Sequence, residues 1–187
     1  MARLYLVRHG KAEADWATKY NPGLDDLGRE QAKVTARSLA PLGPLKIISS
    51  PYARALETAA PLAKIWDAAI QVDERLGEIP SPVKDLAERG EWLQKVIGAK
   101  WLNLDRNLNA WRRHVIEALC EPEENAVVFS HLIAINVAVG QATANDHTLC
   151  FWAENGSVTT IDVNGPVLNL IELGVADATK NWKNINI

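Results

Sequence analysis

Two histidines in this chain each stand directly after an apolar run, where an imidazole could take part in binding or catalysis. The run Leu4-Tyr5-Leu6-Val7 ends in Arg8-His9-Gly10, and the run Ala126-Val127-Val128-Phe129 ends in Ser130-His131. Short apolar runs of this kind are typical of buried strands, and open parallel sheets bind ligands at the carboxyl ends of their strands. A basic pair followed by a permissive glycine is well placed there to meet an anion. We expect that anion to be a phosphate group.

A third apolar run adds another cation to the same edge. Leu45-Lys46-Ile47-Ile48 is followed by Ser49-Ser50-Pro51, and Arg54 comes one helical turn later. A guanidinium offers a planar fork that grips two phosphate oxygens at once. Three strand ends therefore converge on two histidines and two arginines, a set of side chains suited to phosphate binding or phosphoryl transfer.

Strands and helices alternate around these motifs. The segment from Asp25 to Leu39 begins with a helix-capping aspartate, carries apolar residues at helical spacing and is stopped by Pro41-Leu42-Gly43. A second helix is predicted from about Tyr52 to Trp66, and a short strand is predicted at Ile70-Gln71-Val72. The alternation predicts an α/β fold, with a mainly parallel central sheet and helices on both of its faces.

The pattern changes between Ile79 and Leu119, where helical stretches follow one another without a convincing strand. We interpret residues 79–119 as a helical cap insertion over the site, within a single domain that covers residues 1–187. After the insertion, a helix is predicted from Leu132 to about Gln141. The dipeptides Asn155-Gly156 and Asn164-Gly165 indicate β-hairpins in the last part of the chain.

Taken in order, the motifs resemble those of the histidine phosphatase superfamily, also called the phosphoglycerate mutase-like proteins. They are Arg8-His9-Gly10, the stretch from Leu24 to Ala32, the stretch from Ser49 to Ala59, Glu78, and Ser130-His131. The resemblance spans most of the chain. It implies the fold of that family and a metal-independent phosphatase that needs no cofactor and forms a covalent phosphohistidine intermediate.

The resemblance also implies roles for the basic residues. His9 would be the nucleophile, which requires that its attacking nitrogen is unprotonated while the other ring nitrogen donates to a nearby acceptor. Arg8 and Arg54 would bind the transferring phosphoryl group. His131 would act as a second catalytic side chain by donating to the same group, and the backbone N–H of Leu132, at a helix start, would add another donor.

A leaving alkoxide needs a proton, and the resemblance nominates Glu78 as the general acid, with a raised pKa. Gly10, Ser49 and Ser50 are further candidates for the phosphate site, although a serine at a strand-to-helix turn is usually a helix cap. Asp15 stands where many members of the family carry an asparagine. Its carboxylate would repel a dianion unless it turns away, pairs with an arginine or serves as an alternative proton donor. Lys11 also departs from the family pattern.

Composition narrows the range of partners. A net charge of −3 and a pI near 5.8 argue against nonspecific binding to nucleic acid or to an anionic membrane. No uninterrupted apolar run approaches the roughly 20 residues that span a bilayer, so we expect a cytoplasmic protein. Neither Cys120 nor Cys150 is followed by the arginine- and glycine-rich loop of a cysteine-dependent phosphatase. The expected partner is a small phosphorylated metabolite or a phosphoprotein, and the sequence does not predict an oligomeric state.

Three functions remain open. The first is a phosphatase of class EC 3.1.3, which hydrolyses phosphomonoesters or phosphohistidine. The second is a mutase of the phosphoglycerate type, which hands the phosphoryl group to a second hydroxyl. The third is a protein that binds a phosphorylated ligand with little turnover, for which Asp15 and Lys11 give some reason. Because mutases of the family usually carry longer insertions, this short chain favours hydrolysis.

Overall fold

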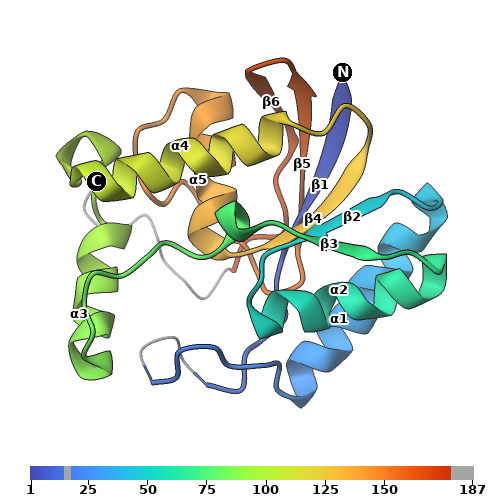
Figure 1. The fold of residues 1–187 in the computed structure, drawn as a ribbon, viewed down its shortest axis with the longest axis horizontal. Coiled ribbons are helices and arrows are strands. Elements are labelled where there is room, and N and C mark those ends of the chain that lie inside the picture. Colours follow the sequence, from blue (N-terminus) through green and yellow to red (C-terminus); the bar gives the residue numbers. More distant parts are fainter. Residues whose placement is uncertain (15–17, 178–187) are drawn as a thin grey trace.

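The computed structural model describes residues 1–14 and 18–177, and within them the centre is a six-stranded sheet (Figure 1). The strands are β1 (Ala2–Arg8), β2 (Lys46–Ser49), β3 (Ile70–Val72), β4 (Ala126–Ser130), β5 (Val158–Asn164) and β6 (Val167–Glu172). Their order across the sheet is β3-β2-β4-β1-β5-β6. The first four strands in this order run parallel, and β5 and β6 are antiparallel to their neighbours. The predicted α/β class with a mainly parallel sheet is confirmed.

The side chains of β4 explain why both faces of the sheet are covered. All five residues of this central strand are buried. Because successive side chains of a strand point to opposite faces, Val128 joins a core that contains Leu4, whereas Val127 and Phe129 join a second core that contains Val7. Each core needs a layer of helices to exclude water from it.

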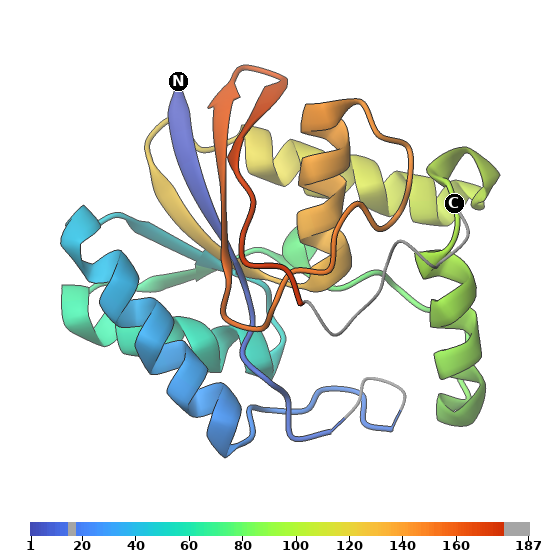
Figure 2. The same cartoon turned by 180° about the vertical axis from the view of Figure 1, so that it is seen from behind.

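Five α-helices supply these layers in the described part of the chain: α1 (Asp26–Leu39), α2 (Ala53–Trp66), α3 (Leu86–Ile97), α4 (Arg106–Cys120) and α5 (Leu132–Thr143). Helices α1 and α2 cover one face of the sheet and α4 and α5 the other, whereas α3 stands at one side (Figures 1 and 2). Short 3-10 helices lie at Ala40–Leu42 (η1), Glu74–Leu76 (η2) and Trp101–Asn103 (η3).

Local signals in the sequence set several of the helix boundaries. Asp25 caps α1, because its side chain accepts a hydrogen bond from the backbone N–H of Gly28. Helix α2 begins at Ala53, one residue after the predicted start, and ends at Trp66 as predicted. Helix α5 is buried continuously from Leu132 to Gly140, which matches its apolar sequence.

The predicted insertion at residues 79–119 is divided between two places in the fold. Helix α4 packs on the sheet beside α5, and its buried residues Leu108, Val115 and Leu119 belong to one of the two cores. Their spacing of seven and four residues places them on one face of the helix. Helix α3 is the part of the insertion that stands apart from the sheet (Figure 1).

The two Asn-Gly dipeptides, each predicted to form a hairpin, lie in different kinds of turn. The hairpin between β5 and β6 turns at Gly165-Pro166, directly after Asn164, and Gly165 has the positive φ of 58° that a type II′ turn requires at its first central position. Asn155-Gly156 makes a turn just before β5 that joins no two paired strands, so the hairpin predicted there is wrong. The side chain of Asn155 instead donates to the carbonyl oxygen of His9.

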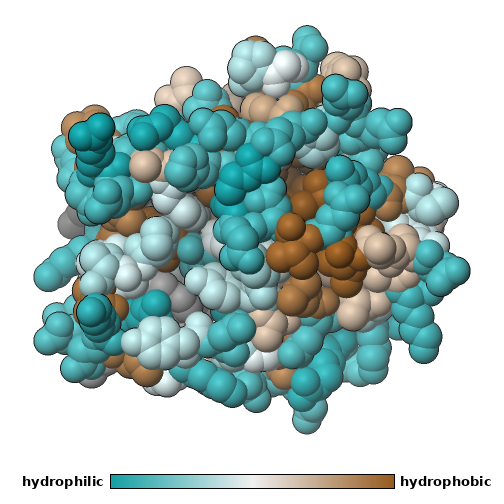
Figure 3. Space-filling model, in the orientation of Figure 1, coloured by the Kyte–Doolittle hydropathy of each residue, from teal (hydrophilic) through white to brown (hydrophobic). Residues whose placement is uncertain are grey.

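The face shown in Figure 3 is mostly hydrophilic, and its most extended apolar patch lies over the region of β3. Strand β3 is short and lies at the edge of the sheet, and Val72 in it is 53% exposed. Within the described residues, no helix combines the length and the apolar character needed to cross a membrane. Cys120 and Cys150 are both half-buried free thiols.

Candidate active site

The two histidines lie side by side because β1 and β4 are neighbours that end at the same edge. In the register of this parallel pair Arg8 stands opposite Ser130, so the next residues, His9 and His131, follow at adjacent strand ends. The backbone N–H of His9 donates to the carbonyl oxygen of Ser130 at 3.0 Å. The two imidazole ring centres are 5.1 Å apart, with the rings edge to face.

The hydrogen bonds of His9 assign its tautomer. Its Nδ1 lies 2.7 Å from the carbonyl oxygen of Gly10, which can only accept, so Nδ1 carries the proton. Its Nε2 accepts a hydrogen bond from Nε of Arg54 at 3.0 Å, so this nitrogen is unprotonated and its lone pair points at the guanidinium. Burial of the ring lowers the pKa of His9 well below its usual value, and the positive charges of Arg54 and Arg8 lower it further. His9 is therefore a neutral imidazole whose Nε2 can act as a nucleophile.

Gly10 fixes the position of this acceptor through a close approach of two backbone segments. A Cβ atom on Gly10 would lie 2.5 Å from the carbonyl oxygen of Gly28, so no larger residue fits without a shift of the main chain. The N–H of Gly10 also donates to Oγ1 of Thr58 at 2.9 Å. Beyond it, Nζ of Lys11 pairs with the helix-capping carboxylate of Asp25 at 3.0 Å. The loop after β1 is thus held against helices α1 and α2.

Arg8 and Arg54 bring two guanidiniums to the same place. Arg54 is 3% exposed, and burial lowers its pKa. Burial also lowers the pKa of Arg8 to about 10, so this side chain is still a cation at neutral pH, and its Nη1 donates to the carbonyl oxygen of Ala153. Nε of Arg8 and Nη1 of Arg54 are buried and have no hydrogen-bond partner. Buried donors of this kind are suited to an anion that accepts from both guanidiniums.

His131 lies next to the ring of His9 and is completely buried. Burial lowers the pKa of His131 well below its usual value, and Arg54, His9 and Arg8 act in the same direction. Its Nε2 shares a hydrogen bond of 2.7 Å with Oγ of Ser50, and its Nδ1 is buried without a partner. Leu132, the next residue, begins helix α5.

Of the two candidate serines, Ser50 is the one whose side chain contacts a site residue, His131. Oγ of Ser49 donates to the carbonyl oxygen of Ser50 at 2.9 Å, and Ser49 is fully buried. Successive residues of an extended chain point to opposite sides, so only one of the two serines can face His131. The sequence showed the serine pair but gave no sign of which member faces the site.

Glu78 adds a partly buried carboxyl group to the site. Its carboxylate accepts hydrogen bonds from the backbone N–H of Ile79, at 3.0 Å, and from that of Ile133 in the first turn of α5. Burial raises the pKa of Glu78 above its ordinary value, although these two hydrogen bonds and the charges of Arg54 and Arg8 act against the rise. A raised pKa allows the carboxyl group to hold a proton closer to neutral pH, as a general acid requires.

These groups open onto a cavity of about 570 Å³. The lining includes Arg8, His9, Arg54, Glu78 and Leu132. It does not include Gly10, Ser49 or His131, which were also candidates from the sequence. Asp15 falls outside the described residues. Among those that are described, no group of three or more His, Cys, Asp or Glu side chains is arranged to hold a metal ion.

Among the cavity-wall residues that the sequence analysis missed are Asn155, Trp152 and Asp177. Asn155 lines the cavity and donates to the carbonyl oxygen of His9 at 2.8 Å. Trp152 and Asp177 also line it, and the N–H of Asp177 donates to the carbonyl oxygen of Trp152 at 2.8 Å. The Asn-Gly pair signalled a turn, but no sequence pattern marked this turn or Asp177 as part of a site.

The sequence profile of the histidine phosphatase superfamily (branch 1) matches residues 4–174, a range that contains every described site residue up to Asn155. The chain belongs to the histidine phosphatase superfamily. The glucosyl-3-phosphoglycerate phosphatase of Mycolicibacterium vanbaalenii is 41% identical to it over 173 residues, which are 85% of this chain and 72% of that protein. The family resemblance predicted from the motifs is thereby confirmed.

Two further proteins are similar over nearly the whole chain. The 2,3-bisphosphoglycerate-dependent phosphoglycerate mutase of Thermoplasma acidophilum is 25% identical over 194 residues, which are 96% of this chain and 97% of the mutase. The structure of phosphoserine phosphatase from Entamoeba histolytica, in complex with 3-phosphoglyceric acid, superposes with a TM-score of 0.75 at 23% identity and covers 95% of this chain and 98% of that one. The structural match shows that the two proteins share a fold.

Proposed function

We propose that this histidine phosphatase superfamily member hydrolyses small phosphomonoesters through a phosphohistidine formed on His9. The observation that carries the proposal is the state of the imidazole: Nδ1 is tied to the carbonyl of Gly10, and Nε2 has its lone pair among the guanidiniums of Arg8 and Arg54. The name of the Mycolicibacterium relative, a phosphatase 41% identical, supports hydrolysis over the other activities.

In the first step, the phosphoryl group of the substrate binds between Arg8 and Arg54, whose buried unpartnered N–H groups donate to its oxygens. Arg54 then exchanges its hydrogen bond to Nε2 of His9 for one to the phosphate. Nε2 attacks phosphorus, the N–P bond forms, and the bond from phosphorus to the ester oxygen breaks. The protonated carboxyl group of Glu78 gives its proton to the departing oxygen, so the product leaves as a neutral alcohol.

In the second step, a water molecule completes the reaction. The carboxylate of Glu78, now without its proton, takes a proton from the water as its oxygen attacks phosphorus. The N–P bond breaks, inorganic phosphate leaves, and both His9 and Glu78 return to their starting forms. In both steps the N–H of Leu132 at the start of α5 donates to the phosphoryl oxygens. We assign the same role to Nδ1 of His131, which is buried without a hydrogen-bond partner, and this requires a shift of the ring toward the cavity.

The test is hydrolysis of 4-nitrophenyl phosphate in excess chelator, with the wild type, His9→Ala and the matched control His114→Ala. His114 is exposed on helix α4, away from the site. We expect turnover without added metal in the wild type and the control, and none in His9→Ala. A phosphoryl label that is stable in alkali and labile in acid should appear on His9 after rapid quenching. Turnover that depends wholly on added metal, or that survives in His9→Ala, would refute the proposal.

The similarity to a phosphoglycerate mutase makes mutase activity the second candidate. It shares the covalent step on His9 and differs in the acceptor of the phosphoryl group, which is a hydroxyl of the substrate in place of water. A product assay on 3-phosphoglycerate separates the two, because a phosphatase releases inorganic phosphate. Rapid isomerisation without phosphate release would reverse our ranking. Anion binding without any labelled enzyme would favour a binding protein.

A further inference from the structure

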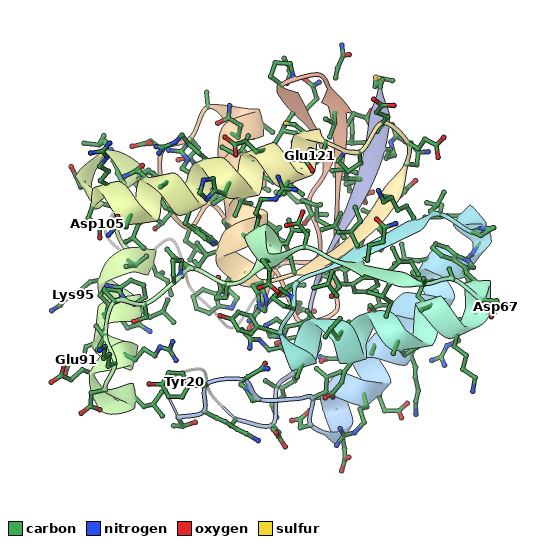
Figure 4. All side chains as sticks on the ribbon, in the orientation of Figure 1. Tyr20, Asp67, Glu91, Lys95, Asp105 and Glu121 are labelled. Atoms are coloured by element: carbon green, nitrogen blue, oxygen red, sulfur yellow. The ribbon has the colours of Figure 1, made fainter. Side chains whose placement is uncertain are left out.

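Ser50 lies beside His131 because β2 and β4 are parallel neighbours in the sheet. Ser50 directly follows β2 and His131 directly follows β4, and Ser49 pairs with Phe129 near the ends of the two strands. The backbone N–H of Ser50 donates to the carbonyl oxygen of Phe129 at 2.9 Å. Side chains fill the region where β2 and β4 end (Figure 4), and both Ser50 and His131 are completely buried. The contact of 2.7 Å between Oγ of Ser50 and Nε2 of His131 is therefore shielded from water.

The partners of the Ser50 hydroxyl set the direction of this hydrogen bond. The backbone N–H of Tyr52 lies 3.3 Å from Oγ of Ser50 and can only donate, so it uses one lone pair of the oxygen. A serine that accepts from the N–H two residues later is typical of a local turn. Within the described part of the chain, Nε2 of His131 is the remaining partner of this hydroxyl. Because a buried O–H group needs an acceptor, Ser50 donates its proton to Nε2.

The direction of this bond decides what His131 can offer to a ligand. Burial, together with the positive charge of Arg54, lowers the pKa of His131, so the ring is neutral and carries one proton. Since Nε2 accepts from Ser50, that proton is on Nδ1, which is buried without a hydrogen-bond partner. His9 has the same tautomer, but its Nδ1 is bound to the carbonyl oxygen of Gly10 and its Nε2 faces Arg54. The two rings therefore have different uses: His9 supplies a lone pair and His131 supplies an N–H.

Resting on the proposed function, we infer that Ser50 is a positioning residue for His131, because its hydroxyl keeps the ring proton on Nδ1 and so makes this nitrogen a donor for the phosphoryl group. The opposite tautomer would turn a lone pair of Nδ1 toward the phosphoryl oxygens, whose negative charge would repel it. Without the Ser50 hydroxyl, Nε2 loses its partner, and nothing then favours a proton on Nδ1 over one on Nε2. Ser50 would thus act on the reaction without contacting the substrate.

The tautomer of His131 is measured by NMR, in long-range proton–nitrogen correlation spectra of protein with isotope-labelled histidines. The chain has four histidines, and the signals of His131 are those that disappear in His131→Asn. At about pH 8, we expect the proton on Nδ1 in the wild type and a substantial share of it on Nε2 in Ser50→Ala. Ser49→Ala is the matched control, because this neighbouring hydroxyl is equally buried and donates to the carbonyl oxygen of Ser50. It should leave the proton on Nδ1.

A double-mutant cycle shows whether the tautomer matters for turnover. Ser50→Ala should lower kcat/KM for 4-nitrophenyl phosphate by about tenfold in the wild-type background, because a donor to the phosphoryl group is weakened. In the His131→Asn background the same change should have an effect of less than about twofold, since the ring through which Ser50 acts is gone. A purely structural loss, such as a displaced end of β2, would lower kcat/KM equally in both backgrounds.

Two kinds of result would overturn the inference. The first is a His131 ring that carries its proton on Nε2 in the wild type, or whose spectrum is the same in the wild type and in Ser50→Ala. The second is an equal loss of kcat/KM in the two backgrounds. Neither result affects the proposed function, which fails if hydrolysis survives in His9→Ala. The spectra need no turnover, so they test the tautomer whatever the activity of the protein.

Discussion

Lowering the pH should destabilise this protein through two buried neutral histidines. His9 is 8% exposed and His131 is completely buried, and burial beside Arg54 and Arg8 lowers the pKa of both rings. In the unfolded chain each imidazole regains a pKa of about 6.5 and binds a proton below it. A group whose folded pKa is depressed stabilises the fold above its unfolded pKa, and this stability is lost as the pH falls towards the folded pKa.

The size of the effect follows from linkage. Each pH unit below about 6.5 removes about 1.4 kcal/mol per histidine from the free energy of unfolding, as long as the folded ring stays neutral. Between about pH 8 and pH 5 the loss is about 2 kcal/mol for each ring, or about 4 kcal/mol for both. Glu78 acts in the opposite direction, because its raised folded pKa stabilises the fold at low pH and loses that contribution as the pH rises.

Urea unfolding followed by tryptophan fluorescence measures the free energy of unfolding at each pH, because the chain has seven tryptophans. In the wild type, the free energy of unfolding decreases between about pH 8 and pH 5. In His9→Asn and in His131→Asn this decrease should be smaller by about 2 kcal/mol. His114→Asn removes one exposed imidazole from α4 and is the matched control. Glu78→Gln should steepen the fall. If His9→Asn and His131→Asn both retain the full wild-type fall, the two rings are not neutral in the folded protein and our reasoning about the nucleophile is wrong.

Three further predictions concern catalysis and the loop after β1. Glu78→Gln should lower kcat for alkyl phosphates by about 10²–10⁴-fold but spare 4-nitrophenyl phosphate, whose leaving group needs little protonation, and similar losses on both substrates would argue against a general acid. Arg54→Lys should lower kcat/KM by about a hundredfold, nearly as much as Arg54→Ala, since an ammonium cannot replace the fork; full rescue by lysine would contradict bidentate binding. Gly10→Ala should destabilise the fold by about 1–3 kcal/mol in urea unfolding, because its Cβ would lie 2.5 Å from the carbonyl oxygen of Gly28, and wild-type stability would show that the two segments separate easily.

Local patterns in the sequence were sufficient to predict the strands and the helix that position the site residues. The apolar runs before Arg8-His9 and Ser130-His131 form β1 and β4, and the capping aspartate Asp25 starts α1 as predicted. These features are encoded by near neighbours, through strand and helix periodicity and through capping. Because the carboxyl ends of parallel strands meet at one edge of a sheet, the order of the motifs was sufficient to predict that two imidazoles and two guanidiniums lie close together.

Only the tertiary structure decided which neighbouring side chain faces the site and which remote segment closes it. Ser50 in place of Ser49 contacts His131 because the two residues point in opposite directions in an extended chain, and no local signal sets which direction is inward. Asn155 and Asp177 reach the cavity from the far end of the chain. Their positions depend on the antiparallel pairing of β5 with β1 and on the bridge between Ala153 and Ala176, contacts between residues distant in sequence that no periodicity in the chain records.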